Sequence, residues 1–173
     1  MDTFHHNTQF KWFYRSINIT LYPKGLYEVS SLFVLYQYKY MDDDMPTKQV
    51  ILDTNFLMIP FQFKINIFSE LDYLIDISHS YIISSKTLNE LKRIGRTIGK
   101  DGMAARLALK MLEANKIKIE IIKNDAVVDD WIVKYAQKHN AIVCTNDSGL
   151  RKRLRILRVK VITLKSKSRL GYI

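Results

Sequence analysis

Four acidic residues stand where a metal-dependent enzyme would need its carboxylates. Asp53 ends the apolar run 50–52, Glu90 lies within 86–98, Asp129 opens 129–138, and Asp147 follows the apolar run 141–144. In open folds of alternating strands and helices, the carboxyl ends of the strands share one crevice. Oxygen ligands gathered there suit Mg²⁺ or Mn²⁺. The four positions therefore predict a divalent-metal site.

Each of these acids also has a purely structural explanation. Asp53 and Asp129 are suited to cap helices, because aspartate accepts hydrogen bonds from free backbone N–H groups. Glu90 stands three residues after Thr87, which is the spacing of a capping box. Asp147 lies in an Asn-Asp-Ser-Gly sequence typical of turns. The conjunction favours the metal site, since all four acids fall at the same relative places in successive strand–helix units.

The elements that must position these acids follow from hydrophobic periodicity after residue 49. Strands are predicted at 50–52, 81–84, 118–122, 141–144 and 160–164. Helices are predicted at 63–77, 86–98, 103–115, 129–138 and 149–154. Strands that alternate with helices indicate a central parallel sheet covered on both faces. We therefore expect a three-layer α/β/α fold.

Residues 1–45 differ in character from residues 46–173. They are dense in aromatic residues, lack regular periodicity and end in the acidic triplet 42–44. One interpretation is an N-terminal extension of unclear structure. The other is a start assigned too far upstream, with Met41 or Met45 as the true first residue. Residues 46–173 contain all four acids and form the candidate catalytic domain.

Positive charge is concentrated in the candidate catalytic domain. The formal net charge of the chain is +10. Residues 1–45 carry four Lys or Arg against five Asp or Glu, whereas residues 46–173 carry 23 against 12. Residues 151–169 contain nine Lys or Arg and no acid. A basic surface beside an acidic pocket suits a polyanion that is handled through bound metal ions.

Several other classes of protein are disfavoured by composition. The single cysteine, Cys144, excludes an intramolecular disulfide framework and agrees with a reducing compartment. The four histidines show no zinc-ligand spacing. No apolar run approaches the roughly 20 residues of a membrane span, and residues 1–20 show no signal-peptide pattern. We expect a cytoplasmic protein without a membrane segment.

The motifs in this order resemble those of the PIN-domain ribonucleases. They are Asp53-Thr54-Asn55 after the first strand, Glu90, Asp129 with Ile132 and Ala136 at +3 and +7, and Thr145-Asn146-Asp147 after the fourth strand. Each motif is weakly specific, but the four in order cover residues 48–173. The segments 53–57 and 150–154 look closest to the archaeal VapC-like and ribosomal-RNA-processing branch. Residues 46–173 would then be a PIN-like nuclease domain.

The resemblance implies a metal-dependent endoribonuclease with defined residue roles. Asp53 and Asp147 would bind one or two Mg²⁺ or Mn²⁺ ions directly, with Glu90 and Asp129 completing the shell or acting through water. The ions would activate a water for attack on an RNA phosphodiester. The residues expected to orient these ligands are Asn55, Thr145 and Asp130. Asp130 neighbours Asp129, so the position of the ligand is uncertain by one residue; the +3 and +7 spacing favours Asp129.

RNA and protein partners are implied in the same way. The residues expected to hold the RNA phosphates are Arg93, Arg96, Arg151, Lys152 and Arg153. For Arg93 and Arg96 the alternative is an exposed helix face without RNA contact. An antitoxin protein, a ribosomal precursor and a second copy of the chain are the other candidate partners.

Two alternatives come from different functional classes. A non-catalytic RNA-binding or scaffold protein on the same fold is predicted to have lost an acid, yet none is lost. A phosphotransfer receiver needs paired acids at the first strand, which Lys48-Gln49-Val50 does not supply. The sequence does not separate a toxin of a toxin–antitoxin pair from a ribosomal-RNA-processing enzyme.

Overall fold

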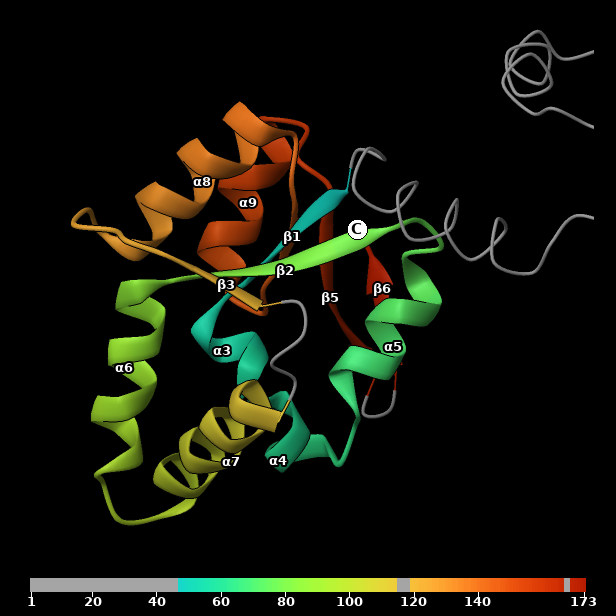
Figure 1. The fold of residues 1–173 in the computed structure, drawn as a ribbon. Helices are drawn as coiled ribbons and strands as arrows, with labels where there is room; N and C mark the ends of the chain where they lie inside the picture. Colours follow the sequence, from blue (N-terminus) through green and yellow to red (C-terminus); the bar gives the residue numbers. More distant parts are fainter. Residues whose placement is uncertain (1–46, 115–118, 167–168) are drawn as a thin grey trace, which may run out of the picture. The chain divides into compact units, whose positions relative to one another are not determined.

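The computed structural model describes residues 47–114, 119–166 and 169–173. Six strands form one sheet (Figure 1): β1 (Lys48–Leu52), β2 (His79–Ser84), β3 (Ile119–Ile122), β4 (Ile142–Cys144), β5 (Val161–Ser166) and β6 (Arg169–Tyr172). The helices are α3 (Thr54–Leu57), α4 (Ile59–Phe63), α5 (Ile67–Leu74), α6 (Ser85–Gly95), α7 (Lys100–Ala114), α8 (Val128–His139) and α9 (Ser148–Ile156). The two interpretations of residues 1–45 concern a segment outside the described residues.

The sheet has the order β3-β2-β1-β4-β5-β6. The first five of these strands run parallel, which confirms the predicted parallel sheet. β6 pairs antiparallel with β5 at the edge, so the strand predicted at 160–164 is not the last one. Only Leu170 of β6 is buried. A four-residue strand with one buried side chain has too little periodicity to be recognised in the sequence.

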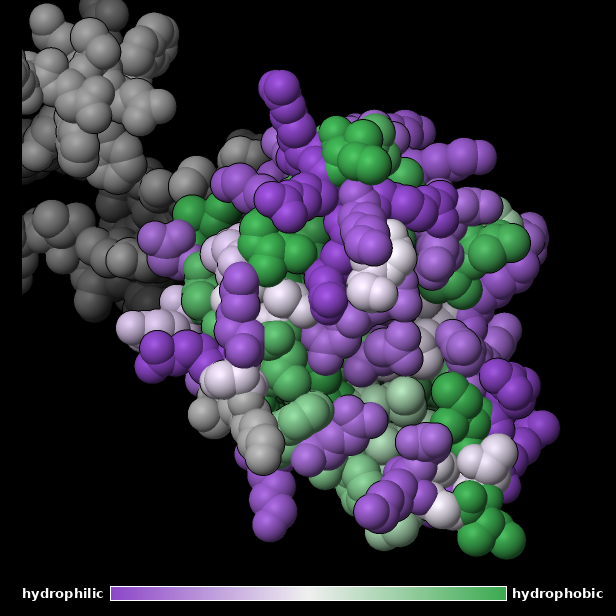
Figure 2. Space-filling model, turned by 180° about the vertical axis from the view of Figure 1, so that it is seen from behind, coloured by the Kyte–Doolittle hydropathy of each residue, from purple (hydrophilic) through white to green (hydrophobic). Residues whose placement is uncertain are grey.

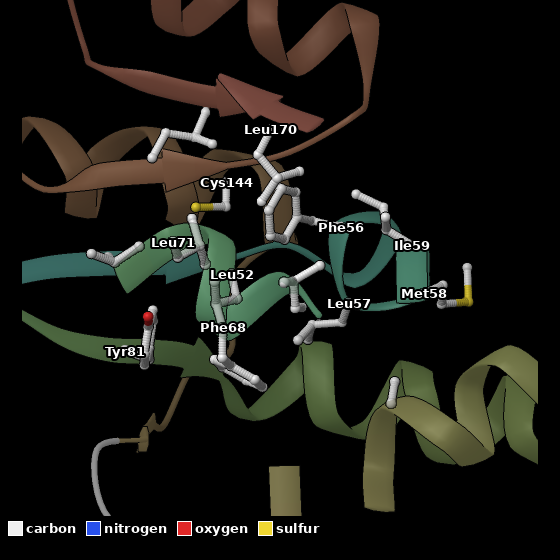
Figure 3. Packing of buried hydrophobic residues seen from close by; sticks show 14 of the residues in the cluster. Leu52, Phe56, Leu57, Met58, Ile59, Phe68, Leu71, Tyr81, Cys144 and Leu170 are labelled. Carbon is white, nitrogen blue, oxygen red and sulfur yellow. The ribbon is translucent and has the colours of Figure 1, made fainter. Parts of the chain in front are cut away.

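Side chains of β1 alternate between two hydrophobic cores, one on each face of the sheet. Val50 and Leu52 join the larger core, which α3 to α7 cover. Figure 3 shows Leu52 of this core beside Phe56, Leu57 and Cys144. Ile51 faces the opposite way and packs with residues of α8 and α9. Because successive strand residues point to opposite faces, three apolar residues in a row serve both cores and confirm the three-layer α/β/α fold.

The helix predicted at 63–77 was wrong in its extent. Three short helices follow β1 instead, and Lys64 ends α4 in the left-handed conformation with φ 54°. Asn66 then caps α5, its Oδ1 accepting a hydrogen bond from the N–H of Ser69 at 3.3 Å. An asparagine cap requires non-helical backbone at its own position, so the amphipathic helix begins only at Ile67.

The described helices give no indication of a membrane segment. None of them combines the length and the apolarity that crossing a bilayer requires.

We predict that a chain beginning at Met45 folds without residues 1–44. All four acids and every strand named above lie after residue 46. Cooperative thermal unfolding by circular dichroism, with a midpoint close to that of the full chain, would agree with this. A truncated protein that is insoluble or unfolds without cooperativity would show that the extension is part of the core.

Candidate active site

Asp53 stands at the carboxyl end of β1 and is held by its neighbours. Its backbone N–H donates to the carbonyl of Cys144 at 3.1 Å, which joins the ends of β1 and β4. Its Oδ1 accepts from the N–H of Thr54 at 2.7 Å, and its Oδ2 accepts from the hydroxyl of Thr145 at 2.6 Å. The side chain is 5% exposed. The capping explanation is therefore confirmed for Asp53, but the cap also places a buried carboxylate where two parallel strands end.

Asp147 reaches the same edge of the sheet from β4. It caps α9, with Oδ1 accepting from the N–H of Leu150 at 2.6 Å. Its own N–H donates to the Thr145 hydroxyl at 3.0 Å. Thr145 thus accepts from the backbone of Asp147 and donates to the carboxylate of Asp53. This buried hydroxyl couples two of the predicted ligands.

Glu90 comes to the site from the middle of α6. Its Oε2 accepts from the hydroxyl of Thr54 at 2.7 Å, across 36 residues of sequence. The capping-box explanation for Glu90 was wrong, because the cap of α6 is Ser84, whose Oγ accepts from the N–H of Thr87 at 3.0 Å. Thr87 lies inside the helix, so Glu90 is turned toward Thr54 rather than toward a helix end.

Asp129 and Asp130 have different surroundings in the first turn of α8. The cap of α8 is Val127, which makes no side-chain capping bond, so the capping explanation for Asp129 was also wrong. Asp130 forms an ion pair with Arg153 at 2.5 Å on the surface. Asp129 is influenced electrostatically by Asp147 and Glu90. Asp129 thus interacts electrostatically with the other carboxylates, whereas the side chain of Asp130 is paired with Arg153.

Burial and mutual repulsion raise the pKa values of two of the carboxylates, Asp53 and Asp129. The pKa of Asp53 is raised to about 6, chiefly by burial and also by the charges of Asp129 and Glu90, against the opposing hydrogen bonds from Thr145 and Thr54. Burial also raises the pKa of Asp129, followed by the charge of Asp147, while Arg153 opposes the shift. A buried anion surrounded by like charges is stabilised by a bound cation.

The carboxylate oxygens of the site suit a hard divalent cation, although the described residues do not form a complete metal-binding cage. In the part of the chain that the structure describes, no group of three or more His, Cys, Asp or Glu could hold a metal ion. Mg²⁺ retains several waters and is commonly bound through only one or two carboxylates, so such a cage is not required. All four candidates offer carboxylate oxygens, and Cys144 points into the apolar core.

Asn146 has a positioning role that sequence reasoning missed. Its Oδ1 accepts from the Thr163 hydroxyl at 2.9 Å and from the N–H of Leu164 at 3.0 Å. Its carbonyl accepts from Nη1 of Arg151 at 2.7 Å. The loop between β4 and α9 is thereby fixed to β5. The signal was present in the motif, since Asn146 is the middle residue of Thr145-Asn146-Asp147.

The predicted RNA-binding residues fall into two groups. Arg93, Arg96 and Lys152 are exposed, as is Asn55 beside the site. Arg151 and Arg153 have partners within the chain: Arg151 donates to Asn146 and, at 3.2 Å, to the Thr163 hydroxyl, and Arg153 pairs with Asp130. The structure therefore places these two arginines in intramolecular contacts near the site.

Comparison with known proteins agrees with this arrangement. Residues 50–167 match the family described as PIN like domain. Ribonuclease VapC4 of Methanocaldococcus jannaschii is 31% identical over 123 residues, which are 69% of this chain and 92% of that protein. Ribonuclease VapC9 of Archaeoglobus fulgidus is 28% identical over 121 residues, covering 69% of this chain and 84% of that protein.

A eukaryotic relative and a solved structure extend the comparison. The rRNA-processing protein FCF1 of Saccharomyces cerevisiae is 28% identical over 120 residues, 68% of this chain and 60% of that protein. The structure of the PIN domain endonuclease Utp24 superposes with a TM-score of 0.61 at 25% identity, covering 73% of this chain and 92% of that one. The chain belongs to the PIN-like domain family.

Proposed function

We propose that this protein is a metal-dependent endoribonuclease. The observation that carries the proposal is the Asp53 carboxylate, whose pKa is raised by burial and by the charges of Asp129 and Glu90, and which Thr145 connects to Asp147. Such a concentration of negative charge is costly without a cation and is characteristic of functional sites. The relatives named as ribonucleases and as an rRNA-processing protein support RNA as the substrate.

The residue roles follow from the contacts. Asp53 and Asp147 are proposed as direct ligands of Mg²⁺ or Mn²⁺, with Glu90 and Asp129 completing the shell or acting through water. When bound, such an ion supplies Lewis acidity and a water nucleophile at neutral pH. Thr54 and Thr145 hold Glu90 and Asp53 in fixed orientations, as hydrogen-bonded neighbours of metal ligands commonly do. Asn55 and Asp130 are further proposed orienting residues.

Exposed cations near the site would hold the RNA backbone. Arg93, Arg96 and Lys152 are free to meet phosphates directly. Arg151 and Arg153 would contribute through the positive potential they add, because their guanidinium groups already have partners in the chain. Contacts of this kind position RNA without reading its sequence.

The named relatives suggest two biological roles for a ribonuclease of this kind. The archaeal relatives favour a toxin with an antitoxin partner, and the rRNA-processing relative favours a ribosomal precursor. A homodimer and a cytoplasmic location are further parts of the proposal. A non-catalytic scaffold is the alternative function, which the retention of all four acids argues against.

Cleavage should require a divalent cation. Purified protein incubated with single-stranded and structured RNA is expected to cut both internally with Mg²⁺ or Mn²⁺ and neither in excess EDTA, because four carboxylates without a cation repel a phosphate. Gel analysis of labelled RNA measures this directly. Equal cleavage with and without EDTA, or none with either ion, would contradict the proposed activity.

A further inference from the structure

Not all of the basic residues lie at the carboxylate end of the sheet. Helices α8 and α9 begin at that end and run to the opposite one, where β1 and β5 start (Figure 1). Five cations lie at or next to these ends of β1, α8, α9 and β5, and we call them the far-end basic surface: Lys48, Lys138, Arg155, Arg158 and Lys160. Lys48 is half-buried and the other four are exposed.

Contacts link the element ends that carry these residues. The Lys48 ammonium donates to the carbonyl of Asn140, the residue that ends α8 in a left-handed conformation. Burial lowers the pKa of Lys48, and the charge of Lys160 lowers it further, which places these two cations close to each other. The turn after α9 closes through the N–H of Arg158 and the carbonyl of Arg155 at 3.0 Å.

Negative charge from the same face does not balance this surface. Residues 134–160 contain eight Lys or Arg and one acid, Asp147, which lies at the carboxylate end. Glu120 of β3, which acts electrostatically on Tyr135 of α8, is an acid on this face, whereas Asp72 lies in α5 and Asp76 just after it, and α5 covers the other face of the sheet. The ends of α8 and α9 each contribute about half a negative charge, which offsets roughly one of the five cations.

The surroundings of the surface are otherwise polar. Figure 2 shows hydrophilic side chains crowding the end of the molecule at which α8 and α9 finish, with scattered hydrophobic ones among them. Ile156, 81% exposed, is one apolar residue of α9 in this region. Isolated apolar residues of this kind are ordinary on protein surfaces. Uncompensated positive charge is therefore the feature that distinguishes this end.

We propose that the far-end basic surface binds the phosphate backbone of RNA outside the segment that is cleaved. This rests on the proposed function, because it assigns the RNA a second contact on the same domain. The twelve residues of α8 span roughly 18 Å. Stacked nucleotides advance about 3.4 Å along one strand, so a stacked segment of about six nucleotides reaches from the carboxylates to this surface, whereas the roughly two nucleotides that a four-nucleotide RNA leaves on one side of the cleaved bond do not.

Binding in EDTA tests this surface independently of cleavage. The full-length protein carries Lys138→Gln, Arg155→Gln and Lys160→Gln, and its affinity for a labelled 30-nucleotide single-stranded RNA is measured by fluorescence anisotropy across a salt series. Three lost phosphate contacts are expected to reduce the log–log salt slope by about 2, at roughly 0.7 for each contact on a single strand. Each single substitution should give about a third of this change.

A matched variant separates the effect of this surface on RNA binding from the effect of net charge. Lys64→Gln, Lys100→Gln and Lys110→Gln remove the same charge from exposed positions in the α4–α5 turn and on α7. That control should keep the salt slope of the wild type. Circular dichroism checks the fold of both triple variants. An unchanged slope in the far-end variant, or an equal loss in the control, would overturn the proposal.

Cleavage assays add a test of length. With Mg²⁺, the far-end variant should show a raised KM for the 30-nucleotide RNA and the wild-type kcat and KM for a four-nucleotide RNA. Equal changes for both lengths would contradict the proposed reach. If the wild type cleaves no RNA at all, the proposed function fails, whereas the salt series in EDTA still decides whether this surface binds RNA.

Discussion

Replacing Asp53 by asparagine is expected to lower the rate of RNA cleavage by roughly a hundredfold or more, since even residues that only orient metal ligands account for 10- to 100-fold effects. Asparagine preserves the acceptor for the N–H of Thr54, and the Thr145 hydroxyl can rotate to accept from the new amide. What disappears is one buried negative charge. Initial rates on a labelled RNA at saturating Mg²⁺ measure the loss.

Asp125→Asn is the matched control for this substitution. Asp125 is an exposed acid in the loop before α8 and lies outside the set of four. That variant should cleave at the rate of the wild type, with the same thermal midpoint. If Asp53→Asn retained most of the activity, Asp53 would not be a ligand. If it failed to fold, the carboxylate would serve the structure rather than the chemistry.

Local sequence signals were sufficient to predict the carboxylate end of the sheet. Val50-Ile51-Leu52 must be buried on both faces, so the residue that follows stands at the end of a central strand. Asp53 and Asp147 are at once caps and candidate ligands, because a cap sits where a strand gives way to a helix. For Asp53 the capping explanation and the proposed ligand role are therefore compatible, and Asp147, for which the sequence suggested a turn, is a cap in the same way.

Contacts between distant residues could not be predicted from the sequence. That Glu90 meets Thr54, and that Asp130 rather than Asp129 pairs with Arg153, depends on how α6, α8 and α9 pack on the sheet. Side-chain partners across 23 to 36 residues leave no local periodicity. The same holds for Arg151, which was predicted to bind RNA from its charge but donates to the loop of Asn146.

The metal-free protein should lose stability as the pH rises, and Asp53 should be a main cause. Its pKa is raised from 3.8 to about 6 in the folded state. The folded protein therefore binds this proton more tightly than the unfolded chain does. Below pH 3.8 the carboxyl is neutral in both states, and its contribution to stability is complete; that contribution disappears as the pH passes through 6. The difference corresponds to about 3 kcal/mol of unfolding free energy.

Asp53→Asn isolates this effect, because asparagine does not titrate. In EDTA, urea unfolding of the wild type and the variant should give similar stability near pH 4. By pH 7 the variant should be more stable by about 3 kcal/mol, or about 10 °C in thermal midpoint for a chain of this length. Excess Mg²⁺ at pH 7 should then stabilise the wild type more than the variant, since a cation compensates a charge that only the wild type carries. A stability difference that stays constant from pH 4 to 7 would show that burial and the neighbouring charges do not destabilise the ionised Asp53 carboxylate, and the electrostatic basis for a bound cation at this site would be lost.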